Sequence, residues 1–408
     1  MEAKSLRREL ATAGCDALLV VATSSSDPDM APFIDGARLG ETFLIATREA
    51  APQLGYLSPM EREEAEGTGL PILDPAKLHL REIEAGVDTR GEVWGLLLER
   101  AFSLLAIAPC RLAVGGRFFN GELYSALSHL ERLGWRVQSA NEILRRLRRR
   151  KSRADLDEIR RAARATKDAF RRVAALLRRS SSRQGELWLD GERLRIRRLR
   201  STIAVCFADH EVREVEGNLV AAGEEGAVPH SGGSSDRVLR VGESLIVDLF
   251  PKAKLFADCT RTFCVGQAST RLAAAHAAVL EALRTAHSHV RPGVRGWDLQ
   301  RRICELLQAR GHPTPISAPG TEAGYVHGLG HGVGYELHEV PHFRKNGSLD
   351  DGILREGDVL TLEPGLYYPN EGFAVRLEDL LYLGPNGSEN LTDLPYDLDP
   401  QKWPTTVE

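Results

Sequence analysis

The sequence predicts a two-domain protein in which both domains combine helices and strands. A chain of 408 residues is long enough for two domains of ordinary size. Helical and strand patterns alternate through the first part of the chain, which indicates an α/β layer. Near residues 145–153 a run of basic residues ends that alternation. Beyond it, acidic residues stand at the ends of apolar strands, and glycine and histidine gather in one segment.

The N-terminal domain, residues 1–150, is predicted to be an α/β domain. Residues 4–12 are predicted to form a helix, and the apolar run at 16–22 a buried strand. The pattern continues with strands at 41–46 and 53–57, a helix at 92–106, a strand at 111–114, a helix at 121–133 and a strand at 135–139. We find no group of catalytic residue types in this part, so the chemistry is expected in the second domain, residues 151–408.

The basic run at residues 145–153 allows two interpretations. All of these residues except Leu147 and Ser152 are basic, as in some nucleic-acid-binding patches. Acidic residues follow at 155–158, and the chain carries a formal net charge of −4. We therefore favour a solvated helix and expect no nucleic-acid partner. Apolar residues at helical spacing then predict a long helix from Leu156, and further helices are expected at 271–290 and 296–310.

Composition and cysteine use predict a cytoplasmic protein with no membrane partner. The chain has no apolar run of 18 residues, and its first residues lack the apolar core of a signal peptide. The cysteines show no CxxC spacing, so they are interpreted as reduced core thiols: Cys15, Cys110, Cys206, Cys259, Cys264 and Cys304.

Histidine and glycine dominate residues 327–334, and a further histidine, His338, follows shortly after. Glycine lets the backbone approach a ligand closely. Histidine is suited to bind a metal or to move a proton near neutral pH. The segment therefore indicates a site in which His331 is the best candidate ligand; the alternative is a glycine-rich loop with solvent-exposed histidines.

Residues 243–262 have the pattern of a strand, a short turn and a second strand. Asp248 interrupts an apolar strand where a hydrophobic residue is expected. If the turn is centred on Ala253, Asp248 lies directly opposite Asp258, and two like charges there repel unless they share a cation. The alternative is an edge hairpin whose aspartates point into water.

Two more carboxylates follow apolar strands. Glu363 ends the segment at 358–363, and Glu378 lies two residues after Arg376, so these two side chains should point to the same face of one strand. The alternatives are a polar turn before Pro364 and a surface pair between Arg376 and Glu378.

Together these residues form a candidate ligand set of four carboxylates and one imidazole. Hard oxygen ligands with one nitrogen suit Mn, Co or Zn acting on water, with Mn favoured. Bridging carboxylates hold two such ions about 3.5–4 Å apart in hydrolytic centres. The set comprises Asp248, Asp258, His331, Glu363 and Glu378.

At residues 150–385 the chain resembles the pita-bread metallopeptidases, which include prolidases (Xaa-Pro dipeptidases), aminopeptidases P and methionine aminopeptidases. The resemblance rests on the two aspartates with their Cys-Thr-Arg-Thr continuation, the His-Gly segment with its His-Glu-Val-Pro continuation, Leu-Glu-Pro-Gly at 362–365 and Arg-Leu-Glu-Asp at 376–379. It implies an α+β pita-bread (creatinase/methionine aminopeptidase-like) catalytic domain over 151–408, after a creatinase-like N-terminal domain over 1–150.

The resemblance also implies roles for individual residues. It makes Asp258 and Glu378 bridging ligands of two divalent metal ions, with Asp248, His331 and Glu363 completing the set. Glu363 would also serve as the catalytic base. His338 would act in catalysis and, with three other residues, bind substrate; those three are His230, His327 and Arg376.

The chain departs from the family pattern in two places. The two aspartates are ten residues apart, where relatives have eleven or more, so the hairpin turn should be short. Prolidases also use a second arginine for the substrate carboxylate, for which Arg344 and Arg355 are the candidates here. That departure leaves strict dipeptidase specificity open.

The function predicted is hydrolysis of the Xaa–Pro bond of dipeptides or short peptides by a homodimer with two metal ions. One alternative is an Xaa-Pro aminopeptidase. Others are a related hydrolase or lyase acting on another small amide, a metal-free enzyme of the creatinase kind, or a binding module without catalysis.

Overall fold

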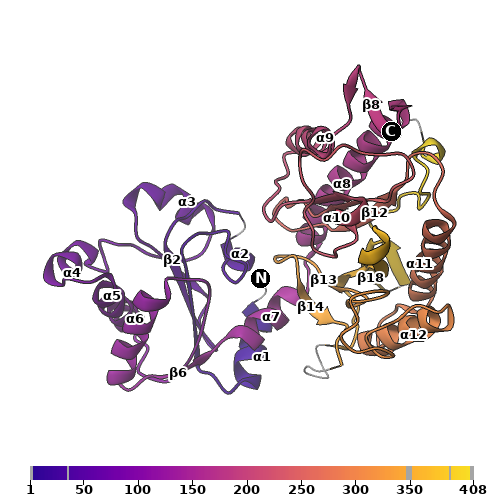
Figure 1. The fold of residues 1–408 in the computed structure, drawn as a ribbon. Coiled ribbons are helices and arrows are strands. Elements are labelled where there is room, and N and C mark those ends of the chain that lie inside the picture. Colours follow the sequence, from indigo (N-terminus) through magenta and orange to yellow (C-terminus); the bar gives the residue numbers. More distant parts are fainter. Residues whose placement is uncertain (1–2, 35, 346–351, 386, 405–408) are drawn as a thin grey trace. The chain divides into compact units, whose positions relative to one another are not determined.

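The computed structural model describes residues 3–34, 36–345, 352–385 and 387–404 (Figure 1). The chain forms two compact units, Met1–Arg150 and Lys151–Glu408. Each is described by itself.

The first unit is built around a mixed β-sheet. Its strands are β1 (Ala17–Ala22), β2 (Thr42–Thr47), β3 (Gln53–Tyr56), β4 (Ile72–Leu73), β5 (Arg111–Gly115) and β6 (Arg136–Ser139). They are ordered β4-β3-β2-β1-β5-β6. β1 pairs antiparallel with β2 and parallel with β5. The strands and helices predicted for this part of the chain are present within a few residues of their expected bounds.

Helices cover both faces of this sheet. They are α1 (Ala3–Thr12), α2 (Ala31–Ile34), α3 (Arg62–Gly67), α4 (Leu80–Gly86), α5 (Arg90–Leu104), α6 (Asn120–Arg132) and α7 (Asn141–Arg149). Alternate residues of β1 point to opposite faces. Leu18 and Val20 therefore join the core formed with α1 and α7, whereas Leu19 joins the core formed with α5 and α6.

The second unit contains several small antiparallel sheets. They are built from β7 (Ser181–Arg183), β8 (Glu186–Leu189) and β9 (Glu192–Arg193); β10 (Leu219–Ala222), β11 (Leu245–Leu249) and β12 (Cys259–Phe263); β13 (His331–Gly332), β14 (Glu339–His342), β15 (Val359–Leu362), β18 (Asp379–Gly384) and β19 (Gly387–Asn390); and β16 (Gly365–Tyr368) with β17 (Phe373–Arg376).

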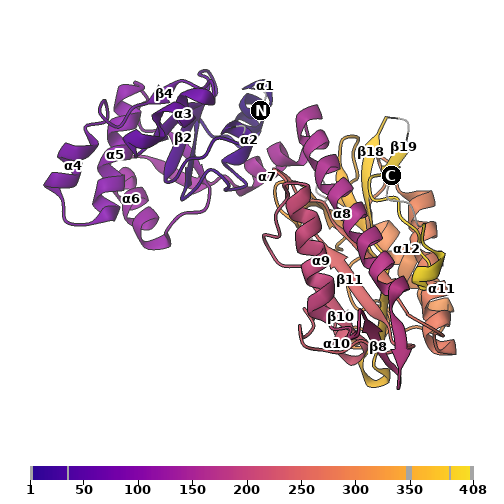
Figure 2. The ribbon, with the colours of Figure 1, turned by 90° about the horizontal axis from the view of Figure 1, so that it is seen from above.

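Two pairs of helices flank these sheets (Figure 2). α8 (Arg153–Arg179) and α9 (Ile196–Asp209) lie along one side, and the short α10 (Gly223–Gly226) follows β10. α11 (Thr270–His289) and α12 (Gly296–Ala309) lie along the other side and share a core with β15, β17 and β18. Ser152 and Asp155 form a capping box that begins α8, where the sequence predicts a long helix.

The basic run at 145–153 is not a solvated helix, so that expectation is wrong. α7 ends at Arg149 and α8 begins at Arg153. Arg148 and Arg149 are buried, and Arg148 pairs with Asp29. Lys151 and Glu339 form an ion pair in which both side chains are almost fully buried. Acidic partners distant in sequence make this burial tolerable, and helical spacing alone could not identify them.

Two further expectations concern the cysteines and membrane spans. All the cysteines are free thiols; Cys110 is partly exposed and the others are buried. Within the part of the chain that the structure describes, no helix combines the length and hydropathy needed to cross a bilayer.

Candidate metal centre

The β11–β12 hairpin brings two aspartates together, but in a different register from the one expected. Asp248 pairs with Thr260, and Asp258 lies just before β12. The prediction that the aspartates face each other is therefore wrong. The turn is centred on Lys254, because Lys252 bridges Phe256 across it. Moving the centre of the turn by one residue moves the residue paired with Asp248 by two. Side chains two residues apart point to the same face, so Asp258 stays on the same face as Asp248.

Glycines on either side of His331, the histidine proposed as a ligand, allow it to lie near the two aspartates. A Cβ on Gly330 would lie 2.0 Å from the carbonyl oxygen of Thr361, and one on Gly332 would lie 2.1 Å from that of Val340. Only glycine permits so close an approach of neighbouring strands. His331, between them, begins β13 and is buried. His331 and Gly332 thus lie in a sheet, whereas residues 327–330 lie outside any strand and Gly328 is exposed.

The two glutamates arrive from strand ends. Glu363 directly follows β15, as expected. Arg376 ends β17 and Glu378 precedes β18, so the strand predicted to contain both is interrupted at Leu377. Their side chains nevertheless converge on one atom: Arg376 Nε donates to Thr260 Oγ1 at 3.0 Å, and Thr260 Oγ1 donates to Glu378 Oε2 at 2.7 Å.

The five candidate ligands converge in one buried cluster. One ligand atom from each of Asp258, His331 and Glu378 lies within 4.8 Å of the others. His331 Nε2 lies 3.6 Å from Asp258 Oδ2 and 3.5 Å from Glu363 Oε1. Asp248 Oδ1 joins through Thr260 Oγ1, at 2.8 Å.

Burial and crowding shift the acid–base properties of the cluster. Burial, reinforced by neighbouring carboxylates, holds the pKa values of Asp258 and Glu378 well above their usual range. Burial raises the pKa of Glu363 to about 8. Burial lowers the pKa of His331 to about 3, so its imidazole is neutral at pH 7 and keeps a lone pair for a metal.

These residues fit a divalent metal ion. Asp258 Oδ1 is a buried oxygen without a hydrogen-bond partner, which a bound cation would satisfy. Four carboxylates and a neutral imidazole form the oxygen-rich donor set that Mn, Co or Zn accepts. More carboxylates converge here than one tetrahedral ion needs, as two adjacent ions require.

Arg376 is held by protein groups on all its guanidinium nitrogens. Besides the Nε bond to Thr260, Nη1 donates to Tyr367 Oη at 2.7 Å and to the carbonyl oxygen of Pro229 at 3.3 Å. Nη2 forms an ion pair with Asp248. Tyr367 Oη in turn lies 3.2 Å from His327 Nε2. The arginine thus links a candidate ligand to a candidate substrate residue.

The other predicted substrate residues lie around the cluster. The rings of His331 and His338 have centroids 4.2 Å apart, and His338 is exposed. His230 is also exposed. Burial lowers the pKa values of His327 and His338, and His230 adds to this effect. Arg344 acts on His338 in the same way, whereas the backbone N–H of the exposed Arg355 donates to Asp358 Oδ2.

Sequence reasoning gave no role to residues that organise the cluster. Thr260 bonds two carboxylates and Tyr367 bonds Arg376 and His327. Thr260 could have been found, because it stands two residues after Asp258 and so faces the same side. Tyr367 gives no comparable sequence signal. Nor does Lys151, whose pairing with Glu339 fixes the strand that follows His338.

Replacing Arg376 by lysine should lower kcat about 10- to 100-fold and weaken metal binding, with KM changed less than about 3-fold. Lysine is a single point charge and cannot keep the bonds to Thr260, Tyr367 and Asp248 together. Kinetics and metal content of Arg376→Lys test this, with Arg271→Lys at an exposed ion pair as the control. A loss confined to KM would instead assign the guanidinium to substrate binding.

Solved structures share the fold over nearly the whole chain. The prolidase from Pyrococcus horikoshii OT3 is 20% identical with a TM-score of 0.73, and the match covers 97% of this chain and 99% of that one. An Xaa-Pro dipeptidase from Bacillus anthracis is 21% identical with a TM-score of 0.76, covering 97% and 98%. The prediction of a pita-bread protein with a preceding α/β region is confirmed.

Within that class, the chain belongs to metallopeptidase family M24, whose model matches residues 157–385, more than half of the chain. Curated relatives include the Xaa-Pro dipeptidase of Pyrococcus furiosus, 33% identical over 181 residues, or 44% of this chain and 48% of that protein. The probable dipeptidase PepE of Mycobacterium tuberculosis is 28% identical over 265 residues, or 64% and 62%. The chain thus spans about half to two thirds of these relatives' length.

Proposed function

We propose that this protein is a two-metal peptidase that hydrolyses the Xaa–Pro bond of dipeptides or short peptides. The observation that carries the proposal is the convergence of four carboxylates and one neutral imidazole in a buried cluster, with further histidines beside it. Relatives named Xaa-Pro dipeptidase support the choice of bond.

In this proposal Asp258 and Glu378 would be ligands shared by two divalent ions, and Asp248, His331 and Glu363 would complete the ligand set. When bound, the ions supply Lewis acidity and lower the pKa of water toward neutrality. Thr260 and Arg376 hold Asp248 and Glu378 in place through the bonds described above. These bonds would orient the acidic ligands before the substrate binds. Electrostatic catalysis depends on such preorganised groups.

Glu363 is the ligand best placed to exchange a proton with water. Its side chain is 19% exposed, whereas that of Asp258 is 6% exposed. We assign to Glu363 the acceptance of the proton from the attacking water, in addition to its role as ligand. A general base must lie within hydrogen-bond reach of the proton that it takes, and the carboxylate at the open side of the cluster meets that condition.

His338, His230 and His327 form the substrate side of the proposed site. The ring of His338 lies beside that of His331, tilted by 50° to it, and is exposed, so its imidazole is open to a substrate. It would donate a hydrogen bond to the oxygen on which negative charge develops during attack. His327, anchored by Tyr367, and His230 would contact the peptide on either side of that oxygen.

Several finer properties belong to the same proposal. We propose Mn as the working metal, a homodimer as the assembly and the cytoplasm as the location. Mn suits the oxygen-rich ligand set. The free cysteines fit a reducing compartment. The proposed partner is a small peptide, with no role for nucleic acid or membrane.

A substrate panel on enzyme reconstituted with Mn tests the proposal. Xaa-Pro dipeptides should be cleaved at least about 100-fold faster, in kcat/KM, than dipeptides without proline, a discrimination of roughly 3 kcal/mol. Xaa-Pro-Xaa tripeptides in the same panel separate dipeptidase from aminopeptidase activity. Equal rates for proline and non-proline peptides would contradict the proposed specificity. Turnover only of other small amides would favour the related-hydrolase alternative.

A further inference from the structure

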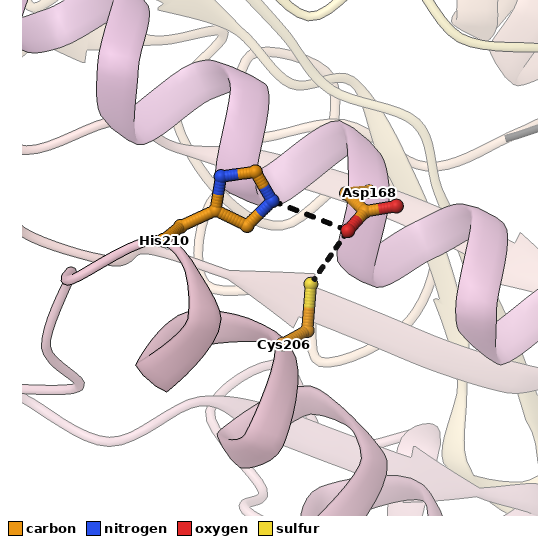
Figure 3. A group of neighbouring side chains, drawn as sticks. All are labelled: Asp168, Cys206 and His210. Carbon is orange, nitrogen blue, oxygen red and sulfur yellow. Dashed lines mark hydrogen bonds and ion pairs between the residues drawn. The ribbon is translucent and has the colours of Figure 1, made fainter. Parts of the chain in front are cut away.

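A second group of metal-binding side chains lies between α8 and α9 (Figure 3). Asp168 comes from α8, Cys206 from the last turns of α9, and His210 from the residue that ends α9. Cys206 and His210 are four residues apart, so one face of the helix presents both. In Figure 3 the thiol and the imidazole point to the same oxygen of Asp168. None of these residues belongs to the candidate metal centre.

The two distances to Asp168 in this group are close to those between ligand atoms around a tetrahedral ion. Cys206 Sγ lies 3.3 Å and His210 Nε2 3.2 Å from Asp168 Oδ2, and the ligand atoms all lie within 4.8 Å of one another. A tetrahedral zinc ion, with bonds of about 2.0–2.3 Å, holds its ligand atoms about 3.3–3.6 Å apart. Only a small adjustment is needed to coordinate one.

Asp168 is also a buried carboxylate whose hydrogen-bonding capacity is only partly satisfied. The residue is 8% exposed, and its Oδ1 is buried without a hydrogen-bond partner, whereas Oδ2 is approached by Cys206, His210 and Arg172. A buried carboxylate oxygen without a partner is costly. An ion on Oδ2 would offset the cost of burying this carboxylate, whereas Oδ1 points away from Cys206 and His210 (Figure 3).

We propose that Asp168, Cys206 and His210 bind a zinc-like divalent ion that joins α8 to α9, separate from the catalytic centre. A cysteine–histidine–carboxylate set is typical of zinc, in contrast to the oxygen-rich set of the other cluster. The side chain of His210 is 31% exposed, so the ion has access from solvent and a water can take the fourth position.

The surrounding charges balance such an ion. Binding requires the thiolate, so the Cys206 proton leaves to solvent as the S–metal bond forms. Asp168, Asp209 and the thiolate then carry three negative charges, against two on the ion and one on Arg172. Arg172 is already shared between the two aspartates, at 3.0 Å from Asp168 Oδ2 and 2.7 Å from Asp209 Oδ2. Without the ion, burial raises the pKa of Cys206 to about 12, which keeps the thiol protonated.

Cobalt substitution in the full-length protein distinguishes this site from the catalytic one. A thiolate ligand gives Co²⁺ an intense near-ultraviolet charge-transfer band, and the candidate catalytic ligands include no thiolate. Co²⁺ titration of the metal-free wild type should therefore produce the band. Zinc content measured by mass spectrometry should be one equivalent per chain higher than in Cys206→Ser.

Matched variants decide the outcome. Cys206→Ser keeps the size of the side chain and should lose the band. His210→Ala, at a partly exposed position, should weaken ion binding at this site by at least about 100-fold. Cys264→Ala, which removes another buried thiol, should retain the band. If wild type shows no band and the same zinc content as Cys206→Ser and His210→Ala, these residues form only a hydrogen-bonded cluster and the proposal fails. Peptidase activity is not part of the readout, so this result is independent of the proposed function.

Discussion

Asp258→Asn and Glu378→Gln should each lower kcat/KM at least about 1,000-fold, or on the order of 4 kcal/mol of transition-state stabilisation. Each carboxylate is proposed to bridge two ions, and its amide has the same shape without the charge. Both residues are buried among other acids, where the neutral amide removes the attraction that holds the ions. Metal content should fall together with activity. The measurements are steady-state kinetics and metal analysis after dialysis against Mn.

The activity of the wild type after chelation is the reference for the loss of activity in these variants. Exhaustive chelation should abolish activity, Mn or Co should restore it, and the two variants should resemble the chelated enzyme even after Mn is added. Glu371→Gln, at an exposed ion pair with Arg271, is the matched control and should behave as wild type. Near-normal turnover and metal content in either amide variant would remove that residue from the ligand set. Full activity after chelation, with no bound metal, would contradict the metal-dependent mechanism as a whole.

The helices and strands that were predicted follow from periodicity, which depends only on local sequence, whereas α9 and the strands β7 to β10 were not predicted. The alternation in β1 follows from the pleat, so Leu18 and Leu19 reach different cores wherever the sheet lies. The long helix α8 was predictable for the same reason, because apolar residues recur at helical spacing from Leu156. Periodicity alone could not predict the overall fold. The resemblance to a known family did so.

The pairing register was not predictable, because it depends on turn geometry. Centring the β11–β12 turn on Ala253 placed Asp258 opposite Asp248, whereas the turn is centred on Lys254 and Thr260 takes that position. Asp258 still faces the cluster despite this error, because a shift of the register by two residues keeps side chains on the same face. An error of one residue would have turned Asp258 away from the cluster.

Ion-pair and hydrogen-bond partners that are distant in the chain could not be predicted from the sequence either. The basic run was interpreted as solvated because acidic residues follow it in the chain, yet Lys151 is buried against Glu339 and Arg148 pairs with Asp29. The hydrogen-bond partners of the Arg376 guanidinium are mostly distant in sequence and could not be predicted from it. The sequence analysis therefore assigned Arg376 to substrate binding. The structure adds Tyr367 and Thr260 as its partners, which favours a positioning role.

His331→Ala and His338→Ala should separate metal binding from catalysis. The two rings lie 4.2 Å apart between centroids, so a general disturbance of this segment would affect both variants alike. His331 is buried between Asp258 and Glu363, and its loss removes the one imidazole of the candidate ligand set. His331→Ala should therefore lose metal and fall below about 0.1% of wild-type kcat, a change of about 4 kcal/mol.

His338→Ala should keep its full metal content and lower kcat and kcat/KM by similar factors, about 100- to 1,000-fold. An oxyanion donor acts only as charge develops, and removing such a donor costs roughly that much. Metal analysis and steady-state kinetics on both variants provide the comparison, with His289→Ala, a histidine at the end of α11, as the control. Loss of metal from His338→Ala and retention in His331→Ala would exchange the two roles. If neither variant changed metal content or rate, the segment would have no part in the site, and the glycines around His331 would serve only the close packing of β13 against β14 and β15.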